Sequence, residues 1–312
     1  MPEPAKQQLA ISQQFAAARK KRRLLDNLRA WGYISPATIL FLIFTFVPMF
    51  FALYVSLHRW NLLKPMQWYG VGHYLDALSN SDFWNSLWVT AYYVLGSVPI
   101  KICFAILIAS ILNQKMRGIG FYRLMIFLPV ITSFVAVSIV WKYFYNPQSG
   151  LFNYVLGLFA LGPIKWLQDP NWSMPSLILL AVWKGIGYDI VIFLAGLQAI
   201  PSMYYEAAAI DGANRWQRFR QVTLPLLSPV VFLVVILDII NAFQMFVPSF
   251  VLTRNGGPLQ TTNVITLYIY NQAFSYLKMG YASAISYILF FIILVFTILN
   301  FKLGEKRVHY QS

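Results

Sequence analysis

The amino-acid sequence predicts an all-α integral membrane protein with six transmembrane helices, and three observations lead to this fold class. Of the 312 residues, 59% are hydrophobic and only 11% are charged, against about 25% charged in an ordinary soluble domain. The apolar residues gather in six long blocks, and ~20 helical residues are enough to cross about 30 Å of hydrocarbon. Aromatic residues make up 17% of the chain, as is typical of helices anchored at membrane interfaces.

The boundaries of the spans follow from the apolar blocks. We expect spans at residues 33–57, 87–112, 124–145, 174–199, 226–252 and 281–303. The first block is too long for a cleaved signal peptide and lacks a small-residue cleavage site after it. The predicted organisation is therefore a basic tail at 1–32, a membrane domain at 33–303 that contains a loop helix within 201–225, and a second tail at 304–312.

The Lys and Arg residues indicate which ends of the spans face the cytoplasm. Sixteen of them lie in the two tails and in the second and fourth loops, whereas five lie in the other loops. Because Lys and Arg are retained on the cytoplasmic side, we expect both termini in the cytoplasm. The basic cluster Lys20 to Arg23 is interpreted as an anchor to anionic lipid headgroups, and a partner-binding element is the alternative.

Composition also excludes several classes of function. The net charge of +14 does not indicate nucleic-acid binding, because the basic residues alternate with apolar blocks. His58, His73 and His309 are scattered, the single Cys103 excludes an internal disulfide, and no HExxH, CxxC or phosphate-loop motif occurs. We therefore expect no catalytic residue, metal or cofactor in this chain, and any work that it does at a membrane must be driven by a gradient or by a partner subunit.

The loop between spans four and five predicts a short helix outside the bilayer. Pro201 ends span four, Ser202 is expected to cap the new helix, and Glu206 falls near its positive dipole end. A turn at Gly212 then leads through a second, basic helical stretch to Pro225 in the first turn of span five. On composition alone, the loop is equally well interpreted as an amphipathic interfacial segment.

The order of residues in this loop resembles the EAA loop of permease subunits in binding-protein-dependent ABC importers. The matching residues are Glu206, Ala207, Ala208, Asp211, Gly212, Ala213, Leu224 and Pro225. Other segments are similar to the sugar-importing, maltose-type branch, and within it to the first of two different permease subunits. These segments are Leu128-Pro129, Trp183, Asn255-Gly256-Gly257-Pro258 and Gly280-Tyr281-Ala282.

The resemblance implies a type I ABC importer permease in a bacterial inner membrane. It implies a heterodimer with a second, homologous permease, two ATPase subunits that hold ATP and Mg, and an extracytoplasmic binding protein that delivers a saccharide. Glu206 would contact the ATPase, Ala207 and Ala208 would allow close approach, and Asp211 and Gly212 would set the shape of the loop. The chain lacks the extra N-terminal spans and the large periplasmic insertion of the longest family members.

Four ionisable residues fall deep within the predicted spans. At ~1.5 Å per residue, their depths pair Lys184 with Asp238 and Lys101 with Asp189. In one interpretation these are buried ion pairs that hold the helices in register. In the other, Lys184 and Asp238 line the translocation cavity and contact sugar hydroxyls or an acidic substituent.

The resemblance also implies sugar contacts on spans three, four and five. The corresponding positions are Ser133, Phe134, Lys184, Gly185, Tyr188, Asp238, Asn241, Ala242 and Met245. Asp238, Asn241 and Gln244 recur at a spacing of three and form a polar stripe on an apolar helix. Aromatic rings such as Tyr188 suit the apolar faces of pyranose rings, although packing is the alternative role. The segment 255–258 is interpreted first as an ordinary turn, and its resemblance to the family loop implies that it faces the binding protein or gates the cavity from outside.

A self-contained, ion-coupled secondary transporter is the alternative function. Asp189 and Asp238 would then be the coupling carboxylates, but the chain shows no repeated halves. The identity, length and charge of the saccharide stay open. Three embedded lysines favour an acidic sugar unless aspartates pair with them.

Overall fold

The structure is a computed structural model that describes residues 27, 29–114 and 117–304, and the chain divides into two units, Met1–Val55 and Ser56–Ser312. In the first unit, the described residues form one apolar helix, Arg29–Ser56, which runs into the start of the second unit. This helix contains a π-helical turn, η1 (Leu42–Phe46), followed by α2 (Val47–Ser56). The Lys20 to Arg23 cluster and residues 305–312 of the predicted C-terminal tail lie outside the described residues.

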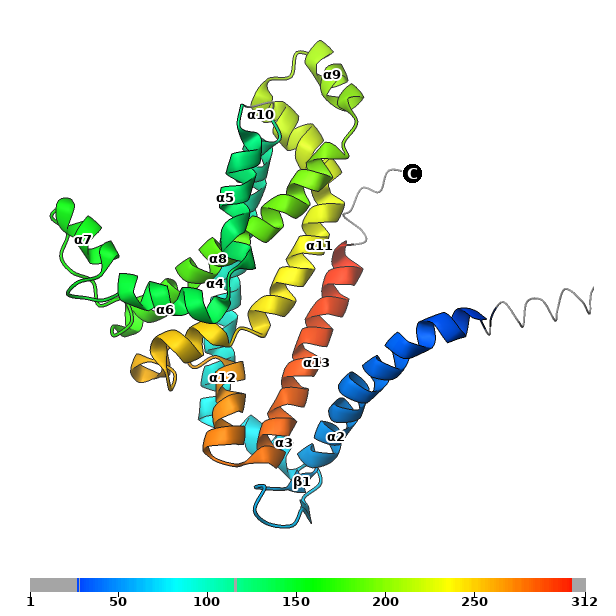
Figure 1. Ribbon diagram of the computed structural model, residues 1–312, viewed down its shortest axis with the longest axis vertical. Coiled ribbons are helices and arrows are strands. Elements are labelled where there is room, and N and C mark those ends of the chain that lie inside the picture. Colours follow the sequence, from blue (N-terminus) through cyan, green and yellow to red (C-terminus); the bar gives the residue numbers. More distant parts are fainter. Residues whose placement is uncertain (1–26, 28, 115–116, 305–312) are drawn as a thin grey trace, which may run out of the picture. The chain divides into compact units, whose positions relative to one another are not determined.

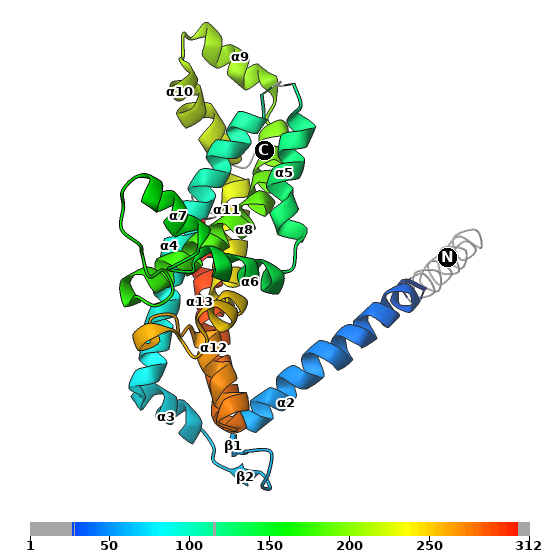
Figure 2. The ribbon, with the colours of Figure 1, turned by 60° about the vertical axis from the view of Figure 1, so that its left-hand side comes forward.

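The second unit is helical apart from one short hairpin (Figures 1 and 2). Strands β1 (His58–Arg59) and β2 (Gln67–Trp68) pair antiparallel, with His58 opposite Trp68. The helices follow in the order α3 (Gly72–Ser79), α4 (Ser81–Leu112), α5 (Ile119–Ile131), α6 (Phe134–Phe144), α7 (Leu151–Leu158), α8 (Pro170–Gln198), α9 (Ser202–Ile210), α10 (Arg215–Arg218), η2 (Phe219–Thr223), α11 (Leu224–Phe243), η3 (Ser249–Thr253), η4 (Pro258–Gln260), α12 (Ile265–Tyr270), η5 (Asn271–Ser275) and α13 (Met279–Gly304). Helices α9 and α10 lie at one end of the unit, and the hairpin and α3 lie at the other.

The predicted spans are confirmed in number. Among the described residues, five helices are long and apolar enough to cross a membrane, and a bent pair makes a sixth span if it is counted as one. Two spans begin several residues earlier than expected because polar side chains cap them. The side chain of Asn80 accepts a hydrogen bond from the backbone amide of Asp82 at the start of α4. The side chain of Asp169 accepts one from the backbone amide of Asn171 at the start of α8.

The prediction of one continuous third span over residues 124–145 is wrong. Helices α5 and α6 meet at a bend of 98°, because Thr132 and Ser133 adopt extended backbone conformations. The hydroxyl of Thr132 donates to the carbonyl of Pro129 at 2.6 Å, so a side chain satisfies one of the carbonyls at the end of α5.

The fifth span also ends earlier than predicted. Helix α11 ends at Phe243 rather than near Leu252, and a π-helical turn, η3, follows a short break. Pro248 lies just after this break and has no amide hydrogen with which to continue the helical pattern. Within the break, the carbonyl of Met245 accepts a hydrogen bond from the hydroxyl of Thr266.

The core of the second unit lies between α4, α8 and α11, and α4 makes its most extensive contacts with α8. Fully buried side chains such as Leu177, Leu180 and Leu227 fill this core. Helix α5 packs closely on α8 because Gly187 has no side chain, and a Cβ there would overlap the carbonyl of Ile126. This packing places charged residues of three helices near one another.

Candidate translocation site and coupling loop

Helix α9 carries Glu206, Ala207 and Ala208 of the segment that resembles the EAA loop. The predicted break at Pro201 is confirmed, since α8 ends at Gln198 and α9 begins after Pro201. The prediction that Ser202 caps this helix is wrong, because Pro201 occupies the N-cap position and Ser202 is the first helical residue, without a side-chain cap. The predicted turn at Gly212 is confirmed by its φ of 75°, which favours glycine.

The surface of α9 and α10 is exposed and partly apolar. Glu206 and Ala207 are exposed and Ala208 is half-buried. Large apolar side chains stand out beside them, with Ile210 at 87% and Trp216 at 65% exposure. Apolar side chains gathered in this way are typical of a surface that a partner covers.

Side-chain contacts hold this loop on the membrane helices. The hydroxyls of Tyr205 and Thr223 lie 3.2 Å apart and join α9 to the turn before α11. Asn214 and Gln217 form a capping box at the start of α10. Helices α10, η2 and α11 together form one long helical segment, so a displacement of α10 is transmitted along α11.

A cavity of about 550 Å³ lies between α4, the α5–α6 bend, α8 and α11. Eight of the nine residues predicted for the substrate path line it. These are Phe134, Lys184, Gly185, Tyr188, Asp238, Asn241, Gln244 and Met245, together with Ala242. Ser133 is not among the lining residues, because it occupies the N-cap of α6 at the bend. The polar stripe and the ring of Tyr188 therefore face one space.

The predicted pairing of Lys184 with Asp238 is wrong. Lys101 Nζ lies 2.6 Å from Asp238 Oδ1 and 3.2 Å from Asp189 Oδ2, so one ammonium contacts both carboxylates. Lys184 instead donates to the carbonyl of Val130 at 3.0 Å. Depth along a helix gives the height of a side chain but not the direction in which it points around the helix axis, and only the packing of the helices supplies the direction.

Three polar residues that line the cavity were not predicted as part of the substrate path. Lys101, Tyr93 and Ser97 reach the cavity from α4. Lys101 carried a signal in the sequence, since it is ionisable and deep within a span. Tyr93 and Ser97 carried none, because an aromatic or a small polar residue in a membrane helix most often packs against a neighbour.

Lys184 lies at the cavity wall between a carbonyl and an aromatic ring. Its ammonium is 5.6 Å from the ring centroid of Phe134, within the range of a cation–π contact. The residue is 9% exposed. Among the described residues, its hydrogen bond and ring contact use only part of the donor capacity of an ammonium with three N–H groups.

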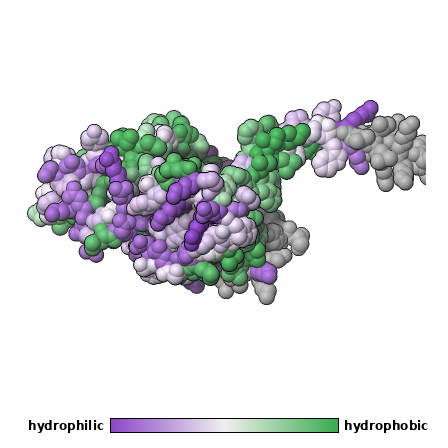
Figure 3. All heavy atoms as spheres, turned by 90° about the horizontal axis from the view of Figure 1, so that it is seen from below, coloured by the Kyte–Doolittle hydropathy of each residue, from purple (hydrophilic) through white to green (hydrophobic). Residues whose placement is uncertain are grey.

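A second, polar cavity of about 670 Å³ opens at the opposite end of the unit from α9. This end is seen face on in Figure 3, where hydrophilic side chains gather at the surface. The lining residues include three cations, Arg59, Lys64 and Lys278, and one carboxylate, Asp76. The guanidinium of Arg59 lies 3.7 Å from the ring centroid of Tyr69.

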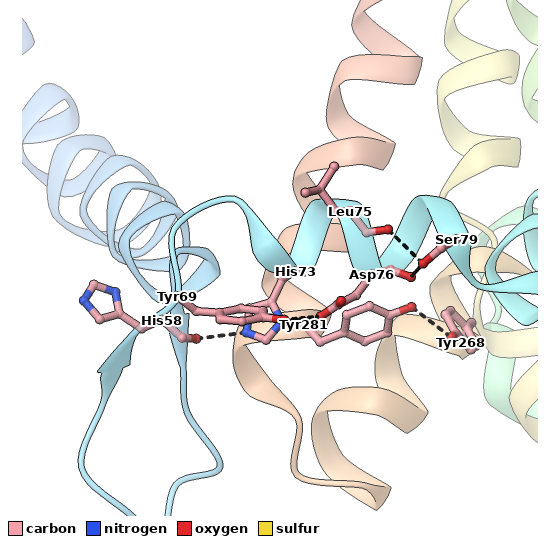
Figure 4. A network of polar contacts seen from close by, with 8 residues as sticks. All are labelled: His58, Tyr69, His73, Leu75, Asp76, Ser79, Tyr268 and Tyr281. Atoms are coloured by element: carbon pink, nitrogen blue, oxygen red, sulfur yellow. Dashed lines mark hydrogen bonds and ion pairs between the residues drawn. The ribbon is translucent and has the colours of Figure 1, made fainter.

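Asp76 is held at the wall of this outer pocket by a network of polar contacts (Figure 4). Tyr69 donates to Asp76 Oδ2 at 3.1 Å, and His73 Nδ1 lies 3.8 Å from the same oxygen. His73 Nε2 donates to the carbonyl of His58 at 3.2 Å and so joins α3 to β1. Burial lowers the pKa of His73 below its ordinary value, so the ring is neutral at pH 7. The outer pocket therefore carries net positive charge.

Comparisons with known proteins agree with this architecture. Residues 70–307 match the family described as the inner membrane component of binding-protein-dependent transport systems. The probable ABC transporter permease protein YesP of Bacillus subtilis is 40% identical over 303 residues, which cover 95% of this chain and 97% of that protein. The trehalose/maltose transport system permease protein MalF of Thermococcus litoralis is 36% identical over 279 residues, covering 88% and 94%.

A solved structure shows the same fold. The crystal structure of a bacterial ABC transporter involved in the import of the acidic polysaccharide alginate contains a chain that aligns with a TM-score of 0.81 at 23% identity. The alignment covers 92% of this chain and 99% of that one. The predicted all-α membrane fold is confirmed, with the β1–β2 hairpin as an addition.

The chain belongs to the family of inner membrane components of binding-protein-dependent transport systems. It is thus a multi-pass inner membrane permease that works with a binding protein, and it is not an enzyme. This membership removes the alternative of a self-contained, ion-coupled transporter.

Proposed function

We propose that this permease moves a saccharide inward through the cavity between α4, α8 and α11. Its partners are a second, homologous permease, two ATPase subunits that dock on α9, and an extracytoplasmic saccharide-binding protein. The observation that carries the proposal is the composition of the cavity wall. Amide and carboxylate groups of Asn241, Gln244 and Asp238 share this wall with Tyr188, so hydroxyls and the apolar faces of a sugar ring both find partners.

The size of the cavity supports a saccharide of a few rings. Its volume of about 550 Å³ lies within the roughly 300–1,000 Å³ that is usual for small-molecule sites. Asn241, Gln244 and Tyr188 are exposed in this chain, and in the proposed heterodimer the second permease closes the site over them. Permeases of trehalose/maltose transport are relatives of this chain, and they are consistent with a sugar ligand.

The exposed surface of α9 and α10 supports the docking of an ATPase. We infer that this end and both termini face the cytoplasm, since most Lys and Arg residues flank the same ends of the spans. Glu206 and its neighbours Ala207 and Ala208 form the central contact, with Asp211 and Gly212 setting the turn that follows. The end that carries the outer pocket then faces the binding protein, and its Arg59, Lys64 and Lys278 attract acidic side chains of that protein.

Purification from native membranes tests the proposed function and the partner set together. The chain should be recovered with a second permease and an ATPase in the ratio 1:1:2, and the reconstituted complex should take up maltose, trehalose or an alginate oligosaccharide only with ATP and binding protein. Capture of the binding protein should weaken as salt is raised from low to about 1 M, where the screening length falls to ~3 Å. Uptake by this chain alone, without ATP, would refute the proposal.

Replacing Asn241 with Leu should lower uptake of the transported saccharide by about tenfold. The amide hydrogen-bonds a sugar hydroxyl, and a hydroxyl left without a partner in a closed site costs ~1–3 kcal/mol, or about one decade of affinity per 1.4 kcal/mol. ATP hydrolysis without substrate should persist in the same preparation. Asn300→Leu is the matched control, because Asn300 lies on α13 outside this cavity and its amide bonds the carbonyl of Phe296 in its own helix. Unchanged uptake by a fully assembled Asn241→Leu complex would show that the sugar path lies on another face of α11.

A further inference from the structure

Three charged residues, two of them buried and one half-buried, join the three central helices at one point. Lys101 on α4 lies between Asp189 on α8 and Asp238 on α11, with side-chain exposures of 16%, 1% and 3%. Asp238 and Lys101 line the cavity, whereas Asp189 is fully buried and is not among the lining residues. Lys101 reaches this place because Gly185 leaves room, since a Cβ there would lie 3.3 Å from Lys101 Cδ and Nζ.

The two carboxylates stand on the two helices that flank the coupling loop. Helix α8 leads directly into α9, and α11 continues from α10 through η2. Lys101 belongs to α4, which is not connected to this loop. One ammonium therefore links both arms of the coupling loop to a third helix and to the wall of the cavity.

The bridge is asymmetric and short of hydrogen-bond donors. The ammonium is closer to Asp238, at 2.6 Å, than to Asp189, at 3.2 Å. Among the described residues, Asp238 Oδ2 and both oxygens of Asp189 are buried without a hydrogen bond. Buried carboxylate oxygens without a hydrogen bond are costly. A hydrogen-bond donor that reaches Asp238 from the cavity would therefore weaken the contact between Asp238 and the ammonium. The ammonium would then move closer to Asp189. The structure shows the arrangement in which Asp238 holds the ammonium more closely, with Asp189 in reach as the second acceptor.

We propose that Lys101 is a positioning residue that couples the cavity to the coupling loop. A saccharide hydroxyl that donates to Asp238 shifts the ammonium toward Asp189, which draws α8 and thereby α9 relative to α4. Coupling between two sites is reciprocal. When the ATPase moves α9, the movement therefore reaches Asp238 through α8, Asp189 and Lys101. This inference rests on the proposed function, because it requires a hydroxyl-bearing substrate in the cavity.

The variant Asp189→Asn tests the bridge without leaving an unbalanced charge. It keeps the pair of Lys101 and Asp238 and removes only the carboxylate on α8. ATP hydrolysis by the complete complex is measured in lipid nanodiscs, first without binding protein. It is then measured with increasing concentrations of binding protein, which is loaded with whichever of maltose, trehalose or the alginate oligosaccharide the unmodified complex takes up. Asp82→Asn is the matched control, since Asp82 lies on α4 at an exposed site outside the bridge.

We expect Asp189→Asn to assemble like the unmodified chain and to hydrolyse ATP at the same basal rate. The maximal stimulation by loaded binding protein should fall at least fivefold, while the concentration of binding protein for half-maximal stimulation stays unchanged. Lys101→Arg should retain stimulation, because a guanidinium fork can contact two carboxylates. A purely structural bridge would change the amount of complex and not the ratio of stimulated to basal hydrolysis.

Three results would overturn the inference. They are full stimulation of Asp189→Asn, an equal loss in Asp82→Asn, and failure of the charge-balanced Asp189→Asn chain to assemble. The unmodified complex separates this test from that of the proposed function. If it shows no stimulation by any loaded binding protein, the proposed function fails and the inference falls with it. If it is stimulated and Asp189→Asn is stimulated equally, only the inference fails.

Discussion

Replacing Lys101 with Met is expected to abolish assembly of the permease into its complex. The ammonium is the ion-pair partner of both Asp189 and Asp238, and its removal leaves two carboxylates facing each other in the core. Removing one partner of a buried ion pair costs about 3–5 kcal/mol, which is a large fraction of the roughly 5–15 kcal/mol that stabilises a typical domain. The amount of complex that elutes as one species after purification in detergent should fall at least tenfold.

Lys184→Met is the matched control for this substitution. Lys184 is also buried and lies on the wall of the same cavity, but its hydrogen-bond acceptor is the carbonyl of Val130 and not a carboxylate. Its loss should therefore reduce assembly much less. Adding Asp189→Asn and Asp238→Asn to Lys101→Met removes every charge of the bridge and should restore assembly. Equal losses for Lys101→Met and Lys184→Met would contradict the ion bridge.

Replacing Glu206 with Lys should stop transport while leaving insertion in the membrane intact. The residue is exposed on α9, so the substitution removes no packing within this chain. It reverses the charge at the surface where we place the ATPase, and a like-charge contact at an interface costs several kcal/mol. Uptake by membrane vesicles should fall at least 100-fold, and the ATPase should no longer be recovered with the permease.

Two further variants separate a local effect of Glu206 from a general effect of charge. Glu206→Gln keeps the shape and loses only the charge, so it should retain part of the uptake. Asp82→Lys makes the same change of charge at an exposed site in the first turn of α4, directly after α3. It should leave recovery of the ATPase unchanged. Retention of the ATPase by Glu206→Lys, with normal uptake, would remove Glu206 from the docking surface.

The number of spans and the position of the loop helix could be read from the sequence because local rules govern them. A block of apolar residues needs only its length to cross the membrane, and Pro201 and Gly212 shape the chain around α9 through their own backbone geometry. The polar stripe of Asp238, Asn241 and Gln244 was also visible, since a spacing of three places residues on one face of a helix.

The breaks within the spans carried weaker local signals. Thr132 and Ser133 bend the third span by 98°, although neither residue by itself prevents a helix. The hydroxyl of Thr132 bonds the carbonyl of Pro129, and the same hydroxyl in another setting would bond within a continuing helix. Whether such a residue bends the chain depends on what the next segment packs against.

The partners of the buried charges were decided only by the tertiary structure. The sequence by itself determined that Lys101, Lys184, Asp189 and Asp238 lie deep in the membrane, since depth follows from position along a span. It did not determine that Lys101 takes both carboxylates, because the direction of each side chain depends on how α4, α8 and α11 rotate against one another. That rotation is set by the close packing of small and large residues across three helices, such as Gly185 beneath Lys101, and no single segment contains it.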